Sequence, residues 1–399
     1  MTGMSWWIMS WAPRQWPMRA SSGSVSSSRH GWIKPRSPLN VEPSWMRSQG
    51  PAGRPSLRKD GPRLMPPAGS PGMPSTMPGR WRTAASRRPL LQNNQISAAR
   101  SRRPGVRVRV PASSANLGPG FDVLALALDL YLEVEAHRAT ETSIAWSGSG
   151  ADEVPLDERN LIVRGLREIV PEGSVRLRVR NAIPIGRGLG SSAASIVAGL
   201  MIGAGFSRDR VTSEHMLEHA FPLEGHGDNL AAAIFGGFCL VTPRGSGAVA
   251  HRLPWPPAWR AVFFVPNALS PTHEARRLVP KRPERADAIF NLARVGEWML
   301  AVSRRDHRLL ASAMEDRMHQ PGRSRAYPYL NPAIAAAKSS GAWGAALSGA
   351  GGSVIAVAPG ARVDEVGDAM VEAARASGVA GVALTLKAAS RGATVVEGA

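Results

Sequence analysis

The chain has 399 residues, which is enough for two ordinary domains with a sizeable core. Its formal net charge of +19 is concentrated in residues 1–105, which hold 17 of the 49 Lys and Arg residues but only two of the 30 acidic residues. Residues 106–399 are therefore near neutral, which argues against a nucleic-acid partner. The single cysteine, Cys239, excludes an internal disulfide framework and indicates a reducing, cytoplasmic setting. The longest apolar run, residues 193–206, is too short for a membrane span, so we expect no membrane partner.

Residues 1–105 differ in composition from the rest of the chain. They hold 15 of the 33 prolines and show no helical or strand-like apolar period, so we predict a disordered basic extension rich in Pro, Trp and Arg. Three interpretations compete: a basic tail that binds nucleic acid, a transit peptide, and an over-extended start, meaning translated upstream sequence outside the working protein. The arginines are scattered and the segment is not amphipathic, which speaks against the first two. We favour the over-extended start.

Regular apolar patterns begin at residue 106. Residues 106–110 and 175–179 alternate strictly between an aliphatic residue and arginine, which predicts two half-buried strands. The other elements expected in this half, in chain order, are a turn-rich stretch (111–120), an apolar run (121–132), a glycine-rich loop (186–190), two helices (192–204 and 213–220) and a strand (236–242).

A second half follows a linker marked by Pro254, Pro256 and Pro257. Residues 286–303 are predicted to form a long amphipathic helix, whose apolar face would hold Ile289, Leu292, Val295 and Met299. The remaining expected elements are strands at 261–265, 353–358, 382–386 and 394–396, and a helix at 363–375. Strands and helices alternate irregularly in both halves, which predicts an α+β fold of two domains.

The strongest local signal is the glycine-rich loop. Gly186, Gly188 and Gly190 leave room for backbone N–H groups to approach an anion, and the loop leads into a helix N-terminus, which also favours one. Ser191 and Ser192 add hydroxyls that can cap the helix or meet a metal ion. A glycine-rich turn without function is the competing interpretation. The whole string from Pro184 to Ala194 resembles a nucleotide-binding motif of small-molecule kinases, which implies that the following residues bind ATP: Pro184, Ile185, Gly186, Arg187, Gly188, Leu189, Gly190, Ser191, Ser192 and Ala193.

The string from Pro184 to Ala194 resembles the nucleotide-binding motif of the superfamily of galactokinases, homoserine kinases, mevalonate kinases and phosphomevalonate kinases (GHMP kinases). Five further segments resemble homoserine kinases in the right order: residues 111–122, 224–229, 272–280, 316–323 and 347–353. Gly227, Gly322 and Gly352 depart from the family pattern, which puts local rigidity in doubt more than chemistry.

This resemblance implies a two-domain GHMP kinase fold. Residues 106–255 would form a ribosomal-protein-S5-like N-terminal domain that binds ATP, and residues 256–399 a ferredoxin-like C-terminal domain, with the active site between them. The implied reaction transfers the γ-phosphoryl group of MgATP to the side-chain hydroxyl of L-homoserine, a step of threonine biosynthesis. We also expect a homodimer.

The resemblance also assigns substrate-binding residues. Homoserine is a zwitterion, so its site needs partners of both charges. Asp122 would hold the ammonium group, and Arg276 and Arg323 the carboxylate, preferably in bidentate geometry. The remaining substrate-binding candidates are Asn116, His226 and Thr272. Asn116 is otherwise a turn residue, a lone Arg is usually solvated, and a lone His is more often structural.

Metal binding and catalysis involve the same motifs. Glu224, Ser191 and Ser192 are the candidates for Mg²⁺, which prefers hard oxygen ligands. Phosphoryl transfer relies mainly on positioning and charge stabilisation. Asn229 and Asp228 are the catalytic candidates: Asn229 could orient the hydroxyl, whereas Asp228 either takes its proton or caps the following helix.

Three other functions stay open. The chain could be another GHMP kinase that acts on mevalonate or a related alcohol. It could be a relative that has lost catalysis and only binds a ligand. A nucleic-acid binder would rest entirely on the basic residues of 1–105. The paired Arg276 and Arg323 argue against the first, and the intact Glu224 and serines against the second.

Overall fold

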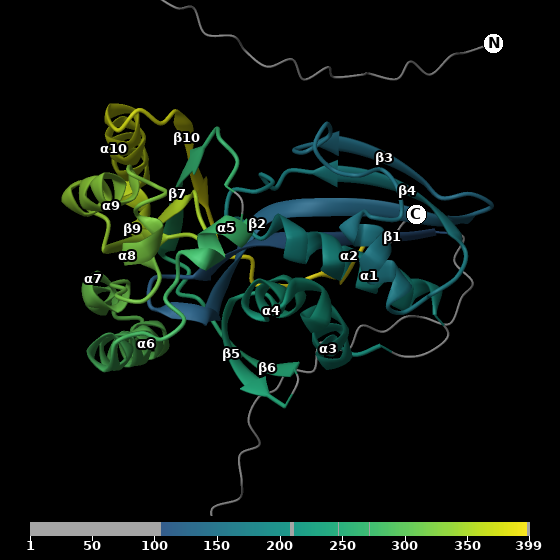
Figure 1. Ribbon diagram of the computed structural model, residues 1–399, viewed down its shortest axis with the longest axis horizontal. Coiled ribbons are helices and arrows are strands. Elements are labelled where there is room, and N and C mark those ends of the chain that lie inside the picture. The colour runs from purple at the N-terminus through teal and green to yellow at the C-terminus, as the bar shows by residue number, and fades with distance from the viewer. Residues whose placement is uncertain (1–104, 208–210, 246, 271, 397–399) are drawn as a thin grey trace, which may run out of the picture. The chain divides into compact units, whose positions relative to one another are not determined.

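A computed structural model of the chain describes residues 105–207, 211–245, 247–270 and 272–396 (Figure 1). The side chains of residues 272 and 273 are not among the described parts. The expectation of a disordered extension over residues 1–105 lies outside this range except for Gly105, which begins the first strand.

The first of two sheets has seven strands. Its main path runs β11–β1–β2–β4–β3, and β5 joins through β2 and β6 through β5. The strands are β1 (Gly105–Asn116), β2 (Gly120–Ala139), β3 (Ser143–Gly148), β4 (Ser174–Asn181), β5 (Phe238–Arg244), β6 (Gly247–Leu253) and β11 (Thr394–Val395). Val106, Val108 and Val110 of β1 are buried while Arg109 is exposed, so the predicted alternation is confirmed.

Four helices belong to this half: α1 (Leu161–Arg167), α2 (Ser191–Phe206), α3 (Ser213–Glu224) and α4 (Asp228–Phe235). The helix α2 is buried on all sides from Ala193 to Gly203, which explains why its sequence is apolar without an amphipathic period. It packs closely against α1, where Gly165 and Gly199 allow the two backbones to approach. Among the described residues, no helix has the length and apolar character that a membrane crossing needs.

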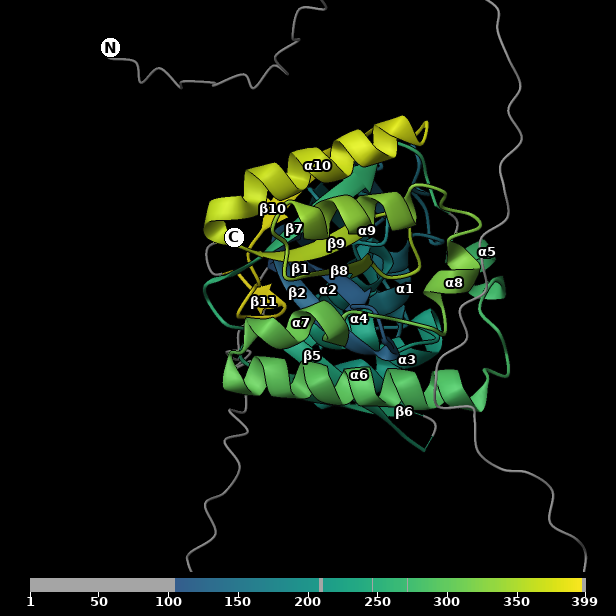
Figure 2. The same ribbon diagram turned by 90° about the vertical axis from the view of Figure 1, so that its left-hand side faces the viewer.

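The second sheet has four antiparallel strands in the order β10–β7–β9–β8. They are β7 (Trp259–Pro266), β8 (Gly344–Leu347), β9 (Val354–Pro359) and β10 (Gly381–Leu386). The helices α9 (Leu330–Ser339) and α10 (Val363–Ala376) lie side by side and bury Val262 and Phe264 of β7 in their own core (Figure 2). A helical segment between β7 and β8 and another between β9 and β10 give the βαββαβ order of a ferredoxin-like unit.

The connection from β7 to β8 carries five helical elements before α9. They are α5 (Thr272–Arg277), α6 (Arg285–Arg304), the 3₁₀ turn His307–Leu309, α7 (Leu310–Ala313) and α8 (Gln320–Arg323); a second 3₁₀ turn, Gly360–Arg362, precedes α10. After β10 the chain returns to the first sheet, where Val395 pairs with Val108 of β1.

The predicted helix at 286–303 is present as α6, and its predicted apolar face is confirmed for Val295 and Met299, which are half-buried and pack against the core, but is wrong for the other two residues. Ile289 and Leu292 are 56% and 73% exposed. The buried face instead holds Asn291, Trp298, Ala301 and Val302. The cause is a polar anchor: the Asn291 amide donates to Asp316 Oδ1 at 2.6 Å, so a polar side chain occupies the inner face and turns Ile289 and Leu292 outward. The stretch 111–120 also differs, because β1 continues to Asn116 before the turn begins.

The close packing of α1 on α2 gives a stability prediction. A Cβ atom at Gly199 would collide with the carbonyl oxygen of Ile162, whereas one at Gly296, in the exposed part of α6, would meet nothing within 4 Å. We expect Gly199→Ala to destabilise the protein by about 1–3 kcal/mol through overpacking. Gly296→Ala, the matched control, should stabilise it by about 0.5–1 kcal/mol. Urea unfolding measures both, and equal effects would contradict the helix contact.

Candidate active site

A cavity of about 210 Å³ brings the separate motifs together. The predicted site residues that line it are Asn116, Asp122, Ile185, Gly186, Gly188, Leu189, Gly190, Ser191, Ser192, Glu224, His226, Asp228, Asn229, Arg276 and Arg323. Pro184, Arg187 and Ala193 belong to the same loop but do not line the cavity, and the side chain of Thr272 lies outside the described residues. Residues not predicted as site residues also line it: Ala115, Val154, Leu161, Ser195, Gly349 and Ala350.

The glycine-rich loop has alternating left-handed glycines. The φ angles of Gly186, Gly188 and Gly190 are 65°, 74° and 70°, a region that residues with a Cβ rarely adopt. Alternation of left-handed and ordinary residues turns successive N–H groups toward one side, which makes an anion-binding concavity. Gly190 is also the N-cap of α2 and supplies no side-chain cap, so the N–H groups of the first turn stay available to a ligand.

The carbonyl groups of this loop are held from behind. Gly186 O accepts a hydrogen bond from the Ser270 amide at 2.8 Å. Ser353 Oγ donates to Arg187 O and Ser348 Oγ to Gly188 O, each at 2.6 Å, and the Ser113 amide donates to Leu189 O at 3.1 Å. Ser113, Ser348 and Ser353 lie inside two of the sequence motifs, but nothing in the sequence predicted a role for them. They keep the electronegative side of the loop away from the cavity.

Arg187 fastens the same loop to the end of β7. Its guanidinium donates to three backbone carbonyl groups: Pro266 O at 2.9 Å, Ile185 O at 2.7 Å and Asn267 O at 2.6 Å. The side chain of this predicted ATP-binding residue therefore holds the loop in place and does not point into the cavity. A sequence motif cannot distinguish these two uses of an arginine.

Ser192 and Glu224 meet where the loop joins α2. Ser192 Oγ donates to Glu224 Oε1 at 2.6 Å. Burial raises the pKa of Glu224 above its usual value, and the hydrogen bond from Ser192 opposes this shift. Two hard oxygen donors beside an anion-binding loop fit the ligand preferences of Mg²⁺, so the donor set is suited to that ion.

His226, Asp228 and Asn229 form a connected turn at the start of α4. Asp228 Oδ1 lies 2.6 Å from His226 Nδ1 and accepts the Asn229 amide at 2.7 Å. Burial alone would lower the pKa of His226, but the hydrogen bond and charge of Asp228 outweigh it and raise that pKa. Asn229 Oδ1 accepts from Ser113 Oγ at 2.8 Å, which leaves the Asn229 NH₂ group as its donor toward the cavity.

Asn116 ends β1 and Asp122 lies near the start of β2, on either side of the turn that joins the two strands, and both have left-handed backbones with φ of 69° and 58°. Asn116 Nδ2 donates to Gly349 O at 2.8 Å, and Asn116 Oδ1 accepts the Asp122 amide at 3.0 Å. The Asp122 carboxylate is bidentate with Arg276, at 2.7 and 3.2 Å, and it also lies near the His226 and Asp228 side chains, with their ligand atoms all within 4.8 Å. Asn116 therefore holds Asp122 in place. Asp122, Arg276, His226 and Asp228 form what we call the mixed-charge corner of the cavity.

Arg323 is buried beside this corner, with only 1% of its surface exposed. Its guanidinium donates to Ala275 O at 3.2 Å and Gly349 O at 3.1 Å. Burial, and secondarily the charge of Arg276, lowers the pKa of Arg323 to about 10. Because this value stays above neutral pH, the cavity contains a buried positive charge.

Comparison with known proteins identifies the family. The family description "GHMP kinases N terminal domain" matches residues 160–237, and "GHMP kinases C terminal" matches residues 298–376. A homoserine kinase of Desulfitobacterium hafniense is 36% identical over 298 residues, which cover 73% of this chain and 100% of that protein. The chain belongs to the homoserine kinase family of GHMP kinases.

Other relatives agree with this membership. A homoserine kinase of Thermus thermophilus is 42% identical over 260 residues, covering 63% of this chain and 86% of that protein. The crystal structure of homoserine kinase from Cytophaga hutchinsonii superposes with a TM-score of 0.67 at 27% identity, over 75% of this chain and 99% of that one. The predicted family and its two-domain α+β fold are confirmed, and this GHMP kinase is an ATP-dependent enzyme that phosphorylates an alcohol group.

The loop geometry gives a prediction for this kinase. A Cβ at Gly190 would overlap the Ser113 hydroxyl and also demand a left-handed backbone from a branched residue. We expect Gly190→Val to weaken the binding of a non-hydrolysable ATP analogue at least tenfold, measured by calorimetry. Gly173→Val is the matched control, because Gly173 is also left-handed (φ 97°) but a Cβ there meets nothing within 4 Å. Loss of stability in the Gly190 variant with normal affinity for the analogue would make the loop a structural turn.

Proposed function

We propose that this protein transfers the γ-phosphoryl group of MgATP to the side-chain hydroxyl of L-homoserine and forms O-phospho-L-homoserine, as in threonine biosynthesis. The observation that carries the proposal is the charge pattern of the cavity. The carboxylate of Asp122 and the guanidinium groups of Arg276 and Arg323 line the same cavity as the anion-binding loop. A zwitterion with a hydroxyl group satisfies both charges and presents its hydroxyl to the phosphates.

The nucleotide would be held by the segment from Pro184 to Ala193. Backbone N–H groups of the loop and of the first turn of α2 would bind the phosphates, because the loop carbonyls are engaged behind them. Ser191, Ser192 and Glu224 would hold Mg²⁺. That ion neutralises charge that develops on the transferring phosphoryl group.

Bound homoserine would break the ion pair between Asp122 and Arg276, and its own charged groups would then pair with these residues. Asp122 would bind the ammonium group, while Arg276 and Arg323 would bind the carboxylate. Asn116, His226 and Thr272 would supply hydrogen bonds. Support for Arg276 over its neighbour comes from exposure: Arg276 reaches Asp122, whereas Arg277 is exposed.

In the reaction itself, we assign Asn229 to orienting the hydroxyl: Asn229 lines the cavity, its oxygen accepts from Ser113, and the remaining NH₂ group can donate to a hydroxyl but cannot remove its proton. Asp228 is engaged with His226 and with the Asn229 amide. We therefore assign Asp228 to holding the His226–Asn229 turn rather than to acting as a base. A loose transition state needs positioning more than a strong base, which fits this arrangement.

The wider organisation belongs to the same proposal. We retain domains at 106–255 and 256–399, a cytoplasmic setting and a homodimer. The exposed Ile289 and Leu292 on α6 support the dimer, because two large apolar side chains one turn apart are better covered by a partner. Light scattering of the intact protein tests it.

Substrate analogues test the proposed function. ADP release should be fastest with homoserine and slow with mevalonate and galactose. Two analogues of homoserine each lack one charge: 4-hydroxybutyrate lacks the ammonium group and homoserinol lacks the carboxylate. Each should lower kcat/KM at least tenfold, since a hydrogen bond to a charged group contributes about 1.5–3 kcal/mol. Faster turnover of mevalonate would identify a different GHMP kinase, and absence of ADP release with every compound would identify a ligand-binding relative.

Arg323 gives a sharper test of the carboxylate site. We expect Arg323→Ala to raise the KM for homoserine roughly tenfold or more while the KM for ATP stays within about twofold, because the hydrogen bonds lost to a ligand involve the substrate carboxylate alone. Arg325→Ala is the matched control, since Arg325 is exposed two residues further along. A change confined to the KM for ATP would remove Arg323 from the substrate site.

A further inference from the structure

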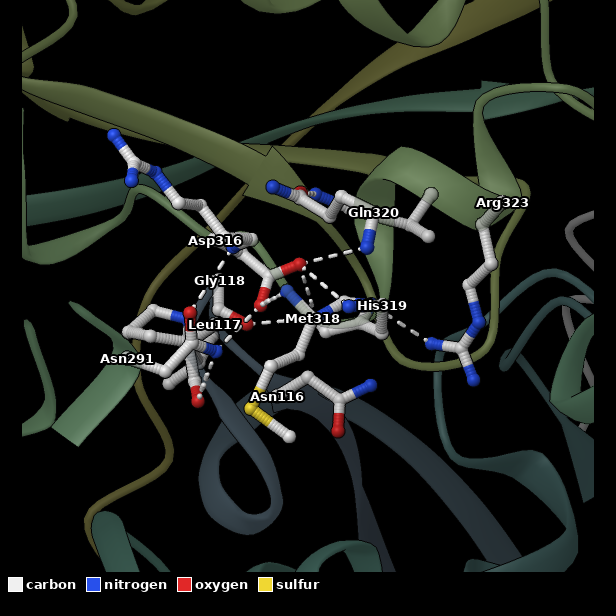
Figure 3. Close-up of polar contacts among 12 residues, drawn as sticks. Asn116, Leu117, Gly118, Asn291, Asp316, Met318, His319, Gln320 and Arg323 are labelled. Atoms are coloured by element: carbon white, nitrogen blue, oxygen red, sulfur yellow. Dashed lines mark hydrogen bonds and ion pairs between the residues drawn. The ribbon is translucent and has the colours of Figure 1, made fainter. Parts of the chain in front are cut away.

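A buried polar cluster lies behind Arg323 and takes no part in the function proposed above. It is formed by Asn291, Asp316, His319 and Gln320 together with the carbonyl of Gly118 (Figure 3). Buried polar groups that are all hydrogen-bonded hold one arrangement of the chain. One ring nitrogen of this cluster, in His319, faces Arg323.

Asp316 fixes the backbone of the segment. Its side chain is fully buried, and its Oδ2 accepts the amides of His319 at 2.9 Å and Gln320 at 2.7 Å. Its Oδ1 accepts the Met318 amide at 3.1 Å and the Asn291 side chain at 2.6 Å. These four hydrogen bonds to one carboxylate fix the position of the backbone at His319 relative to α6 and α8.

The ring of His319 bridges two motifs. Its Nε2 lies 2.7 Å from Gly118 O, and a carbonyl oxygen can only accept, so Nε2 carries the proton. Its Nδ1 lies 3.0 Å from Arg323 Nη1, and a guanidinium can only donate, so Nδ1 carries none. Burial, which is complete here, lowers the pKa of His319 and favours this neutral form, while the charge of Asp316, with its Oδ2 3.7 Å from Nε2, opposes the shift.

The guanidinium of Arg323 is thereby fixed by three acceptors on different segments: Ala275 O, Gly349 O and His319 Nδ1. Its Nη2 group carries two further N–H donors, and none of the described residues supplies an acceptor for them. Since Arg323 lines the cavity, these are the donors left for a ligand.

We propose that His319 is a positioning residue: its unprotonated Nδ1 sets the plane of the Arg323 guanidinium, so that the Nη2 donors face the substrate carboxylate, and its Nε2–H ties that orientation to the turn at Gly118. The proposal rests on the proposed function only for the identity of that carboxylate. A planar fork binds a carboxylate well only when its plane is right, so an unsupported Arg323 would bind less tightly even though its charge remains.

Two substitutions separate the two ring nitrogens. In asparagine the side-chain oxygen is two bonds from Cβ, as Nδ1 is in histidine; in glutamine the amide nitrogen is three bonds from Cβ, as Nε2 is. His319→Asn therefore keeps an acceptor for Arg323 and loses the donor to Gly118 O. His319→Gln keeps that donor and loses the acceptor.

We expect His319→Gln to raise the KM for homoserine about tenfold, with kcat and the KM for ATP within about twofold of the original protein. His319→Asn should restore the KM for homoserine to within about threefold, although its melting temperature falls because Gly118 O loses its donor. An unchanged KM in the Gln variant would overturn the proposal. So would an equal rise of KM in both variants that follows their loss of melting temperature, because that pattern indicates support of the fold alone.

A second measurement does not depend on the substrate. In ¹⁵N spectra of protein labelled at its histidine rings, the signal that disappears in His319→Gln should show an unprotonated Nδ1 and a protonated Nε2 at neutral pH. A protonated Nδ1 would overturn the proposal whatever the substrate is. If the original protein releases ADP with mevalonate and not with homoserine, the proposed function fails, and the same two variants are then compared on mevalonate, which also carries a carboxylate.

Discussion

The hydrogen bonds behind the glycine-rich loop are the constraint on which the active site depends. Ser270, Ser348 and Ser353 belong to the part of the chain that contains the second sheet. They nevertheless donate hydrogen bonds to carbonyl groups of the loop that leads into α2. Because these carbonyls are engaged, the loop presents N–H groups to the cavity. The guanidinium of Arg187 adds two more hydrogen bonds, one to the end of β7 and one to the residue after it. The anion site is thus built by two sheets jointly, although its sequence motif is confined to one segment.

The charges of the cavity are arranged by the same kind of cross-connection. Asp122 is placed by Asn116, which is itself bound to Gly349, and Arg323 is bound to the same Gly349 carbonyl. The positions of the Asp122 carboxylate and the Arg323 guanidinium are therefore both fixed by hydrogen bonds that lead to the carbonyl of Gly349. This arrangement suits a small zwitterion, since the spacing of its two charges is short and fixed by covalent bonds.

Sequence patterns predicted the motifs better than the contacts they make. The loop, the helix at α2 and the alternating strands were evident because glycine spacing and apolar period are local properties. The prediction that Ile289 and Leu292 of α6 face the core was wrong, because a buried Asn291 does not look apolar and its partner Asp316 lies 25 residues away. Arg187 and His319 show the same limit. Both lie inside recognisable motifs. Whether an arginine binds a phosphate or a carbonyl group depends on residues far along the chain, and so does the choice of which histidine nitrogen is unprotonated.

The short strand β11 has a consequence for how the protein comes to be folded. It covers the outer side of β1, where Val108 pairs with Val395, so the first strand of the first sheet is completed by nearly the last residues described. Until the ribosome has released residues 394 and 395, β1 remains an edge strand with unpaired backbone groups. Contacts of such long sequence separation slow folding. The first sheet therefore reaches its final pairing only after residues 394 and 395 have been made, and so after all four strands of the second sheet have been made.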